Sequence, residues 1–326
     1  MVMMLMLIMV ILIFVMMVGY QKEMGEHGFP EKEGICLRKA EDRIFGMVMG
    51  LFALLTVLLL VFLIYFMCRE SLPAIREVGL RGLLLGDQWR PLIFTTVPSY
   101  GFRNMMLSTL YVSVLAVLIA LFIGVGCALF LACATTQRQR MLILPYIDLL
   151  ASIPSVVYGF VGLYIVVKFF EKMGRAAGES VLAGGIVLSV MILPYMISSC
   201  CDTMVKIRER YAPASMAMGV SRWYLAGQLV LPASGKGILI SMALATGRAM
   251  GETMAVMMVM GNSIATPTLL GKAETISALI AMEMGIAEVG STHYSALYAA
   301  GLSLMLLLFA INIIFELLKR RLSREE

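Results

Sequence analysis

The sequence has few charged residues, few histidines and no closely paired cysteines, and each shortage argues against a class of protein. Only 14% of its 326 residues are charged, whereas soluble domains carry about 25%. The 2 histidines, His27 and His293, leave little material for histidine catalysis or for a multi-histidine metal site. The 6 cysteines form no C-x-x-C pair, so neither a zinc site nor a disulfide framework is indicated.

The sequence also lacks a G-x-x-x-x-G-K-[ST] segment, the P-loop that binds ATP. Gly235-Lys236-Gly237 and Gly271-Lys272-Ala273 both fail this pattern. Any ATP-driven work therefore requires a separate subunit. The formal net charge of +5 is small and spread along the chain, so nothing in it indicates a nucleic-acid partner.

Apolar residues are abundant: 60% of the chain is hydrophobic and the mean hydropathy is +0.91. This composition is typical of a protein in a lipid bilayer. A membrane-spanning helix needs about 20 apolar residues. Candidate runs cover residues 1–18, 44–67, 106–133, 142–168, 182–200, 239–262 and 295–317. The segments between them are short, so we predict an all-α, polytopic membrane protein.

The first run differs from the others, and it divides the chain into two parts. We predict an N-terminal extension over residues 1–43 and a bundle of six core transmembrane helices in a domain over residues 44–326. The run 1–18 lacks a basic n-region and a small-residue cleavage site, which makes it a poor signal peptide. It is either an extra N-terminal transmembrane helix or an extended translation start.

The distribution of basic residues predicts the orientation in the membrane, because cytoplasmic loops carry an excess of lysine and arginine. Of the 26 such residues, 16 lie in the four segments 21–43, 134–141, 201–238 and 318–326, and nine lie in the alternate segments. The cluster Lys319-Arg320-Arg321 directly follows the last apolar run. We therefore predict a multi-pass protein of the cell (plasma or inner) membrane with these four segments, including the C-terminus, in the cytoplasm.

The loop 201–238 has a helical pattern rather than a linker composition. Pro213 suits the first position of a helix, and Gly219 can adopt the left-handed conformation that ends one. Ser221 is a natural N-cap for a second helix, which Pro232 closes or returns to the membrane. The pattern predicts helix, glycine turn and helix, built to bind a partner; an interfacial loop without a partner is the alternative.

Two opposite charges lie inside the run 239–262. A charge in a membrane span costs about 2.5–3.5 kcal/mol on insertion scales and usually faces a protein interior or an aqueous path. Arg248 and Glu252 are four residues apart, which places them on one helix face, but arginine before glutamate is the less favourable order. They form either an internal ion pair or an anion site in which the glutamate tunes the arginine.

The fourth run is interrupted by proline. Pro145 and Pro154 remove backbone hydrogen bonds, and Ser152 and Ser155 supply small polar groups beside the break. Broken spans of this kind line cavities in membrane proteins. A kinked helix packed through small residues is the alternative. Asp148 lies near the cytoplasmic end of the run, where it faces the path, sits at the interface or pairs with a basic loop residue.

The loop resembles the EAA loop of ABC importer permeases, which docks a short helix into a cleft of the ATPase subunit. The resemblance rests on the stretch from Pro213 to Gly219 and on Leu229-Val230-Leu231-Pro232, although Pro213 replaces the usual glutamate. It implies ATPase coupling through Ala214, Ser215, Gly219, Leu231 and Pro232.

The string Gly247-Arg248-Ala249-Met250-Gly251-Glu252, which runs on to Gly261-Asn262, resembles a signature of the PstC family of phosphate-specific ABC transporter permeases. Ala151-Ser152-Ile153-Pro154-Ser155 and the residues up to Phe160 are similar to another stretch of that family, and the resemblance covers roughly residues 44–317. It implies the type I ABC importer permease fold and a substrate path for inorganic phosphate that includes Arg248, Glu252, Asp148, Ser152 and Ser155.

The resemblance also implies partners: a sister permease subunit in a heterodimer, two copies of a cytoplasmic ATPase subunit and an extracytoplasmic phosphate-binding protein. It implies no cofactor and no enzymatic activity of this chain. The sister permease of the same system and a permease for another oxyanion, such as molybdate or sulfate, are the alternatives. A non-transport membrane scaffold is more remote, because it would not need Arg248 and Glu252 at mid-membrane.

Overall fold

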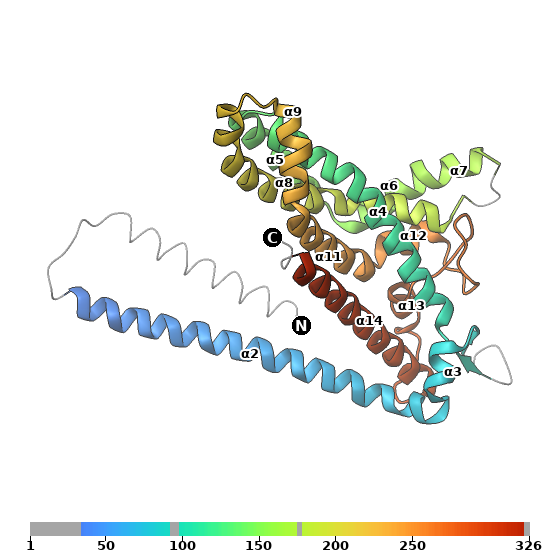
Figure 1. Ribbon diagram of the computed structural model, residues 1–326. Coiled ribbons are helices and arrows are strands. Elements are labelled where there is room, and N and C mark those ends of the chain that lie inside the picture. Colours follow the sequence, from blue (N-terminus) through green and yellow to red (C-terminus); the bar gives the residue numbers. More distant parts are fainter. Residues whose placement is uncertain (1–33, 92–97, 175–177, 323–326) are drawn as a thin grey trace. The chain divides into compact units, whose positions relative to one another are not determined.

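The computed structural model describes residues 34–91, 98–174 and 178–322, most of them in α-helices (Figure 1). The chain folds as two units, residues 1–65 and residues 66–326. The run 1–18 lies outside the described residues, so the extra N-terminal helix stays a prediction. The domain boundary after residue 43 stays a prediction as well.

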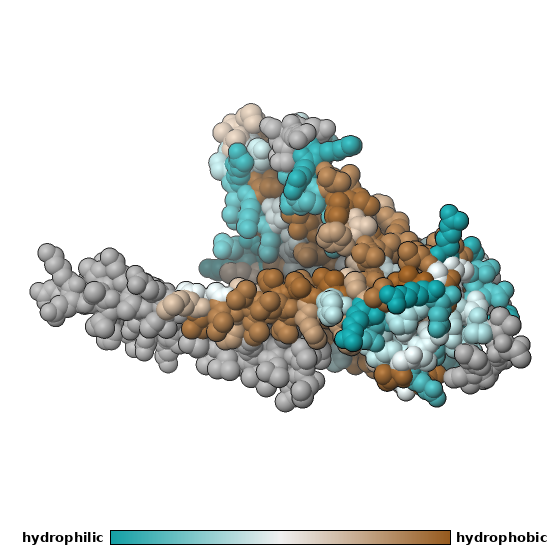
Figure 2. Space-filling view, turned by 90° about the horizontal axis from the view of Figure 1, so that it is seen from below, coloured by the Kyte–Doolittle hydropathy of each residue, from teal (hydrophilic) through white to brown (hydrophobic). Residues whose placement is uncertain are grey.

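Helix α2 (Gly34–Glu77) begins in the first unit. From Phe45 to Glu77 it is long and apolar enough to cross a membrane. Large side chains along it, such as Leu51 and Leu54, are more than half exposed, and Figure 2 shows a band of hydrophobic side chains along the helix. A helix that is apolar on all sides is suited to lipid or to another protein rather than to water.

Three helices form the core of the second unit: α4 (Arg103–Cys133), α8 (Val181–Ala217) and α11 (Gly235–Gly251). Their buried side chains, among them Val112 of α4 and Met191 of α8, meet in one hydrophobic cluster. Glycine brings the helices close together, because a Cβ atom built on Gly185 would lie 2.6 Å from the Leu115 side chain.

The fourth run forms two helical segments that are bent by 82°. The first is α5 (Gln137–Ala151), and the second joins α6 (Ser155–Gly162), the π-helical turn η1 (Leu163–Val167) and α7 (Lys168–Lys172). Pro154 lies at the bend, as predicted, because proline lacks an N–H group and disfavours helix in the preceding residue. Pro145 lies inside α5, which continues through it.

A second bent pair leads from the loop into α11. It begins with α9 (Arg222–Tyr224), η2 (Leu225–Val230) and α10 (Leu231–Ala233) and turns by 61° before α11. The last long helix is α14 (Thr292–Leu322). Four described helices are long and apolar enough to cross a membrane, or up to six if each bent pair is one span, which agrees with the predicted six core helices.

Two predicted spans have different ends in the structure. The run 182–200 is part of the longer helix α8, which continues to Ala217, so the first helix of the loop is not separate. Pro213 lies inside that helix, and the prediction that it begins one is wrong. The run 239–262 is also not one helix, because α11 ends at Gly251 and α12 (Met254–Met260) follows.

The end of the second unit away from the loop holds short elements that the sequence did not predict (Figure 1). They are α3 (Gly79–Leu85), the antiparallel strands β1 (Trp89–Arg90) and β2 (Ser99–Tyr100), and α13 (Ile276–Glu283). The Glu283 carboxylate of α13 connects this helix to β1 and α14. It accepts a hydrogen bond of 2.8 Å from the Trp89 indole and lies 2.7 Å from Nε2 of His293 on α14.

Candidate functional site

Arg248 lies in the last turn of α11, and its side chain is exposed on the surface of the single chain. The guanidinium carbon is 4.3 Å from the ring centroid of Tyr195 on α8, which is a cation–π contact. Within the part of the chain that the structure describes, Arg248 forms no ion pair and donates no hydrogen bond. Its N–H donors therefore remain available to a ligand.

Tyr195 also touches the break in the fourth run. Its hydroxyl group donates a hydrogen bond of 3.3 Å to the backbone carbonyl of Ala151, the last residue of α5. From the other side of the break, the hydroxyl of Tyr158 on α6 donates one of 2.7 Å to the carbonyl of Leu150. The fold thus brings Arg248 and the broken span to the same tyrosine.

Glu252 does not share a helix face with Arg248, so that prediction is wrong. Helix α11 ends at Gly251, and Glu252 has extended backbone angles (φ −75°, ψ 126°). Its carboxylate accepts a long hydrogen bond of 3.5 Å from the Ala255 N–H in the first turn of α12, and its carbonyl accepts one of 3.0 Å from Ser277. Glu252 therefore joins α12 to α13. Its negative carboxylate is stabilised near the N-terminus of α12, which is the positive end of the helix dipole.

The other residues predicted for the path lie on α5 and α6 at the break. Asp148 accepts a hydrogen bond of 2.6 Å from the hydroxyl of Ser198 on α8, which connects the two helices. The Ser152 hydroxyl donates to the Leu149 carbonyl at 2.7 Å within its own segment. Ser155 begins α6, and no side chain caps that helix end. Asp148 and Ser152 are exposed and Ser155 is half-buried.

The coupling loop, residues 201–238, has the predicted glycine turn. Gly219 has a left-handed backbone (φ 67°) after the end of α8, and the N–H of Val220 reaches back to the carbonyl of Ser215 at 3.0 Å. The Ser221 hydroxyl caps the next helix by accepting a hydrogen bond of 3.2 Å from the Tyr224 N–H. Both the turn at Gly219 and the cap at Ser221 are confirmed.

The coupling loop exposes large apolar side chains. Met216, Met218 and Trp223 are 72%, 71% and 79% exposed. Of the residues predicted for ATPase coupling, Ala214, Gly219 and Pro232 are exposed, Leu231 is half-buried and Ser215 is buried. Apolar groups gathered at a loop are typical of a protein-binding surface.

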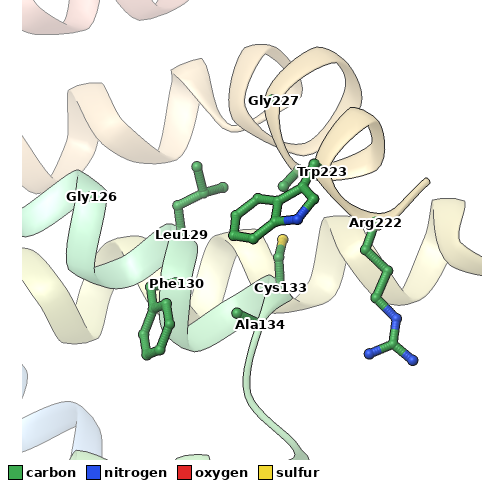
Figure 3. A pocket seen from close by; sticks show the side chains of 9 residues that line it. Gly126, Leu129, Phe130, Cys133, Ala134, Arg222, Trp223 and Gly227 are labelled. Carbon is green, nitrogen blue, oxygen red and sulfur yellow. The ribbon is translucent and has the colours of Figure 1, made fainter.

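A cavity of about 440 Å³ lies between the end of α4 and the coupling loop (Figure 3). The Trp223 ring is turned toward Leu129 and Cys133, whereas Arg222 points away from them. The residues that line it are Gly126, Leu129, Phe130, Cys133, Ala134, Arg222, Trp223, Ala226 and Gly227. Neither Arg248 nor Tyr195 is among them, so this apolar cavity is separate from the site at the broken span.

Sequence reasoning missed Tyr195 and Ser198, the two α8 residues that contact Arg248 and Asp148. Both stand in an apolar span with no charge beside them, and nothing in their spacing points to a partner on another helix. The polar tip of Tyr195 inside such a span was the one available signal, since buried tyrosine hydroxyls usually find a hydrogen-bond partner.

The helical bundle, with its broken spans and its loop of exposed apolar residues, defines a polytopic membrane permease. The family of binding-protein-dependent transport system inner membrane components matches residues 124–324 of the chain. The chain therefore belongs to that family, and it is the permease component of a binding-protein-dependent ABC importer rather than an enzyme. Its place as a multi-pass protein of the inner membrane follows from the family.

Individual relatives agree with this family. The probable ABC transporter permease protein YqgH of Bacillus subtilis is 34% identical over 226 residues, which cover 69% of this chain and 73% of that protein. The phosphate transport system permease protein PstC of Mesorhizobium japonicum is 30% identical over 303 residues, which cover 86% of this chain and 91% of that protein.

The fold has counterparts among solved structures. The crystal structure of a bacterial ABC transporter involved in the import of the acidic polysaccharide alginate matches with a TM-score of 0.59. The match covers 89% of this chain and 99% of that chain at 15% sequence identity. At this identity the likeness concerns the fold alone, and it confirms the predicted all-α permease architecture.

Proposed function

We propose that this chain is the permease subunit of an ATP-driven importer for inorganic phosphate, forming one half of the translocation path. The observation that carries the proposal is Arg248, whose guanidinium lies over the Tyr195 ring, faces the open surface and has no ion-pair partner among the described residues. The planar fork of an arginine donates two parallel hydrogen bonds to an oxyanion. Relatives of similar length that are named phosphate transport system permease proteins support the choice of phosphate.

The exposure of Arg248 is consistent with a translocation path that this chain forms only together with a second permease subunit. A charge on the lipid side of a membrane helix is costly, so a surface that carries one is expected to face protein or water. A sister permease subunit would cover this surface and close the path around the arginine. The α5–α6 break supplies further polar groups there, namely Asp148, Ser152 and Ser155, as broken helices do at substrate sites of transporters.

The coupling loop is the proposed contact with the ATPase, of which two copies would serve the two permease subunits. The left-handed turn at Gly219 and the exposed Met216 and Met218 suit an element that inserts into a cleft of another protein. In this arrangement the C-terminus and the coupling loop are cytoplasmic, and an extracytoplasmic phosphate-binding protein delivers the anion to the opposite face. No chemistry on the substrate is required of this chain.

The proposed mechanism is alternating access. ATP binding closes the two ATPase subunits and moves the coupling loops, and the helices then tilt so that the path opens on the other side. Arg248, with its guanidinium over the Tyr195 ring, holds the anion in the path until the helices move.

The test is uptake of labelled phosphate by cells that lack their own phosphate importers, with this chain and its candidate partners expressed together. We expect phosphate uptake that excess sulfate or molybdate does not suppress. Arg248→Gln should abolish uptake while membrane abundance and ATPase co-purification stay unchanged, and Arg248→Lys should impair it, since an ammonium group lacks the planar fork.

The matched control is Arg81→Gln, which removes an exposed arginine from α3 at the other end of the unit. That variant should transport phosphate normally. Uptake of sulfate or molybdate but not of phosphate would replace the substrate. Normal phosphate uptake by Arg248→Gln, or recovery of uptake when Glu252→Gln is added to it, would remove Arg248 from the path.

A further inference from the structure

Tyr195 stands at the junction of three helices. It follows Pro194 in the middle of α8, and its side chain is 39% exposed, so it is not a core residue. Its ring contacts Arg248 of α11 with 4.3 Å between the guanidinium carbon and the ring centroid. Its hydroxyl group donates to the carbonyl of Ala151 at the end of α5.

These two contacts use different parts of the tyrosine. The face of the ring attracts the guanidinium through its quadrupole. The hydroxyl at the ring edge donates a hydrogen bond to the Ala151 carbonyl of the broken span. Within the described residues the Arg248 side chain has neither an ion pair nor a hydrogen bond, and the ring contact holds it in place. Without the ring, the long arginine side chain would sample several rotamers.

We infer that Tyr195 is a positioning residue for the anion site, and that it holds Arg248 in its binding orientation and links it to the α5–α6 break. This inference rests on the proposed function, because it assigns a role toward the anion that Arg248 is proposed to bind. An ordered donor loses less conformational entropy when it binds its ligand, so the ring raises affinity without touching the anion.

The hydroxyl and the ring make separable contributions. Tyr195→Phe keeps the ring face and removes only the hydrogen bond to Ala151, so the arginine stays in place. Tyr195→Leu removes the ring and the hydroxyl together but keeps an apolar side chain in the same position of α8. The two variants differ in the cation–π contact and share the loss of the hydroxyl.

The experiment measures the KM and the maximal rate of phosphate uptake in the full transport complex. Tyr195→Leu should raise KM about three- to twentyfold, the range expected for a lost cation–π contact, with a maximal rate within about twofold of the unmodified protein. Tyr195→Phe should keep KM within about twofold of the value for the unmodified protein. The control is Tyr164→Leu in η1, which changes a 70% exposed tyrosine that has no ring contact with a described residue and should leave KM unchanged.

Each other outcome has a definite meaning. Equal defects in Tyr195→Phe and Tyr195→Leu, or a loss of maximal rate with unchanged KM, would overturn the positioning role. A KM that stays normal in Tyr195→Leu would overturn it too. If the unmodified complex does not transport phosphate, the proposed function fails by itself, and the same two variants are then compared with the oxyanion that is transported.

Discussion

Glu274 is a buried carboxyl group in the segment between α12 and α13, outside the candidate membrane spans. Burial, together with the smaller effect of the nearby charge of Glu283, raises the pKa of this carboxyl from 4.5 to about 7. The folded chain therefore binds this proton more tightly than the unfolded chain does. Stability must then depend on pH across the interval between the two pKa values.

The free energy of unfolding should fall as the pH rises from about 4.5 to about 7 and level off above, because the unfolded chain loses the proton first. The change due to Glu274 is about 3 kcal/mol, from 1.36 kcal/mol per pKa unit. Glu274→Gln should flatten this part of the pH profile and raise the melting temperature at pH 8. Melting temperatures of the purified protein at pH 5.5 and pH 8 measure both effects.

The control for this prediction is Glu288→Gln, which changes an exposed glutamate in the same region of the chain. It should leave the pH profile as it is. If Glu274→Gln and the unmodified protein lose stability equally between pH 5.5 and pH 8, the buried carboxyl is not the source of the dependence.

At the scale of single residues, the sequence predicted those whose chemistry is unusual for their surroundings. Arg248 was recognised because a charge in a membrane span is energetically costly. Gly219 was recognised because glycine tolerates a left-handed turn. Tyr195 and Ser198 did not stand out, since their roles come from contacts with α11 and α5. Such contacts between distant segments leave no trace in local spacing.

At the scale of an element, the glycine turn between α8 and α9 sets the direction in which the coupling loop returns. Gly219→Val should weaken assembly with the ATPase, because a β-branched residue is strained in the left-handed region, at a cost of about 1–3 kcal/mol. A Cβ atom there would meet no atom within 4 Å, so any defect comes from the backbone and not from a clash. Co-purification of the ATPase with the tagged permease is the measurement.

Gly227→Val is the matched control for the turn. Gly227 also has open space around it, but it lies in the helical turn η2 without a left-handed backbone. The ATPase should co-purify normally with this variant. Undiminished co-purification with Gly219→Val would contradict the role of the turn in docking.

The long apolar runs predicted the existence of the helices better than their ends. Pro154 marked the α5–α6 break correctly, since proline acts through its own backbone. The break between α11 and α12 lacks a proline, and it depends on Gly251 and on the contacts of Glu252 with Ala255 and Ser277. Conversely, α8 continues through Pro213 where the sequence suggested a new start.

At the scale of the whole molecule, the N-terminal extension should be dispensable for transport. The resemblance to the phosphate-specific permeases begins near residue 44, and up to six spans lie among the described residues after that point. Deletion of residues 1–18 should leave membrane abundance and phosphate uptake largely unchanged. A severe loss of uptake in a variant that still inserts normally into the membrane would show that this segment takes part in transport.

Helix α8 has a mechanical consequence that follows from its length. Its 37 residues span about 55 Å at 1.5 Å per residue, from the cap at Ser180 to Ala217 within the coupling loop. Tyr195 lies about 33 Å from the Ala217 end by the same measure. If α8 rotates as a rigid rod by roughly 5° about Tyr195, the Ala217 end moves by about 3 Å. Pro194 removes a backbone hydrogen bond at this fulcrum, so bending there would turn the tyrosine ring relative to Arg248. In the proposed mechanism, movement of the coupling loop would in this way weaken the contact between Arg248 and the anion.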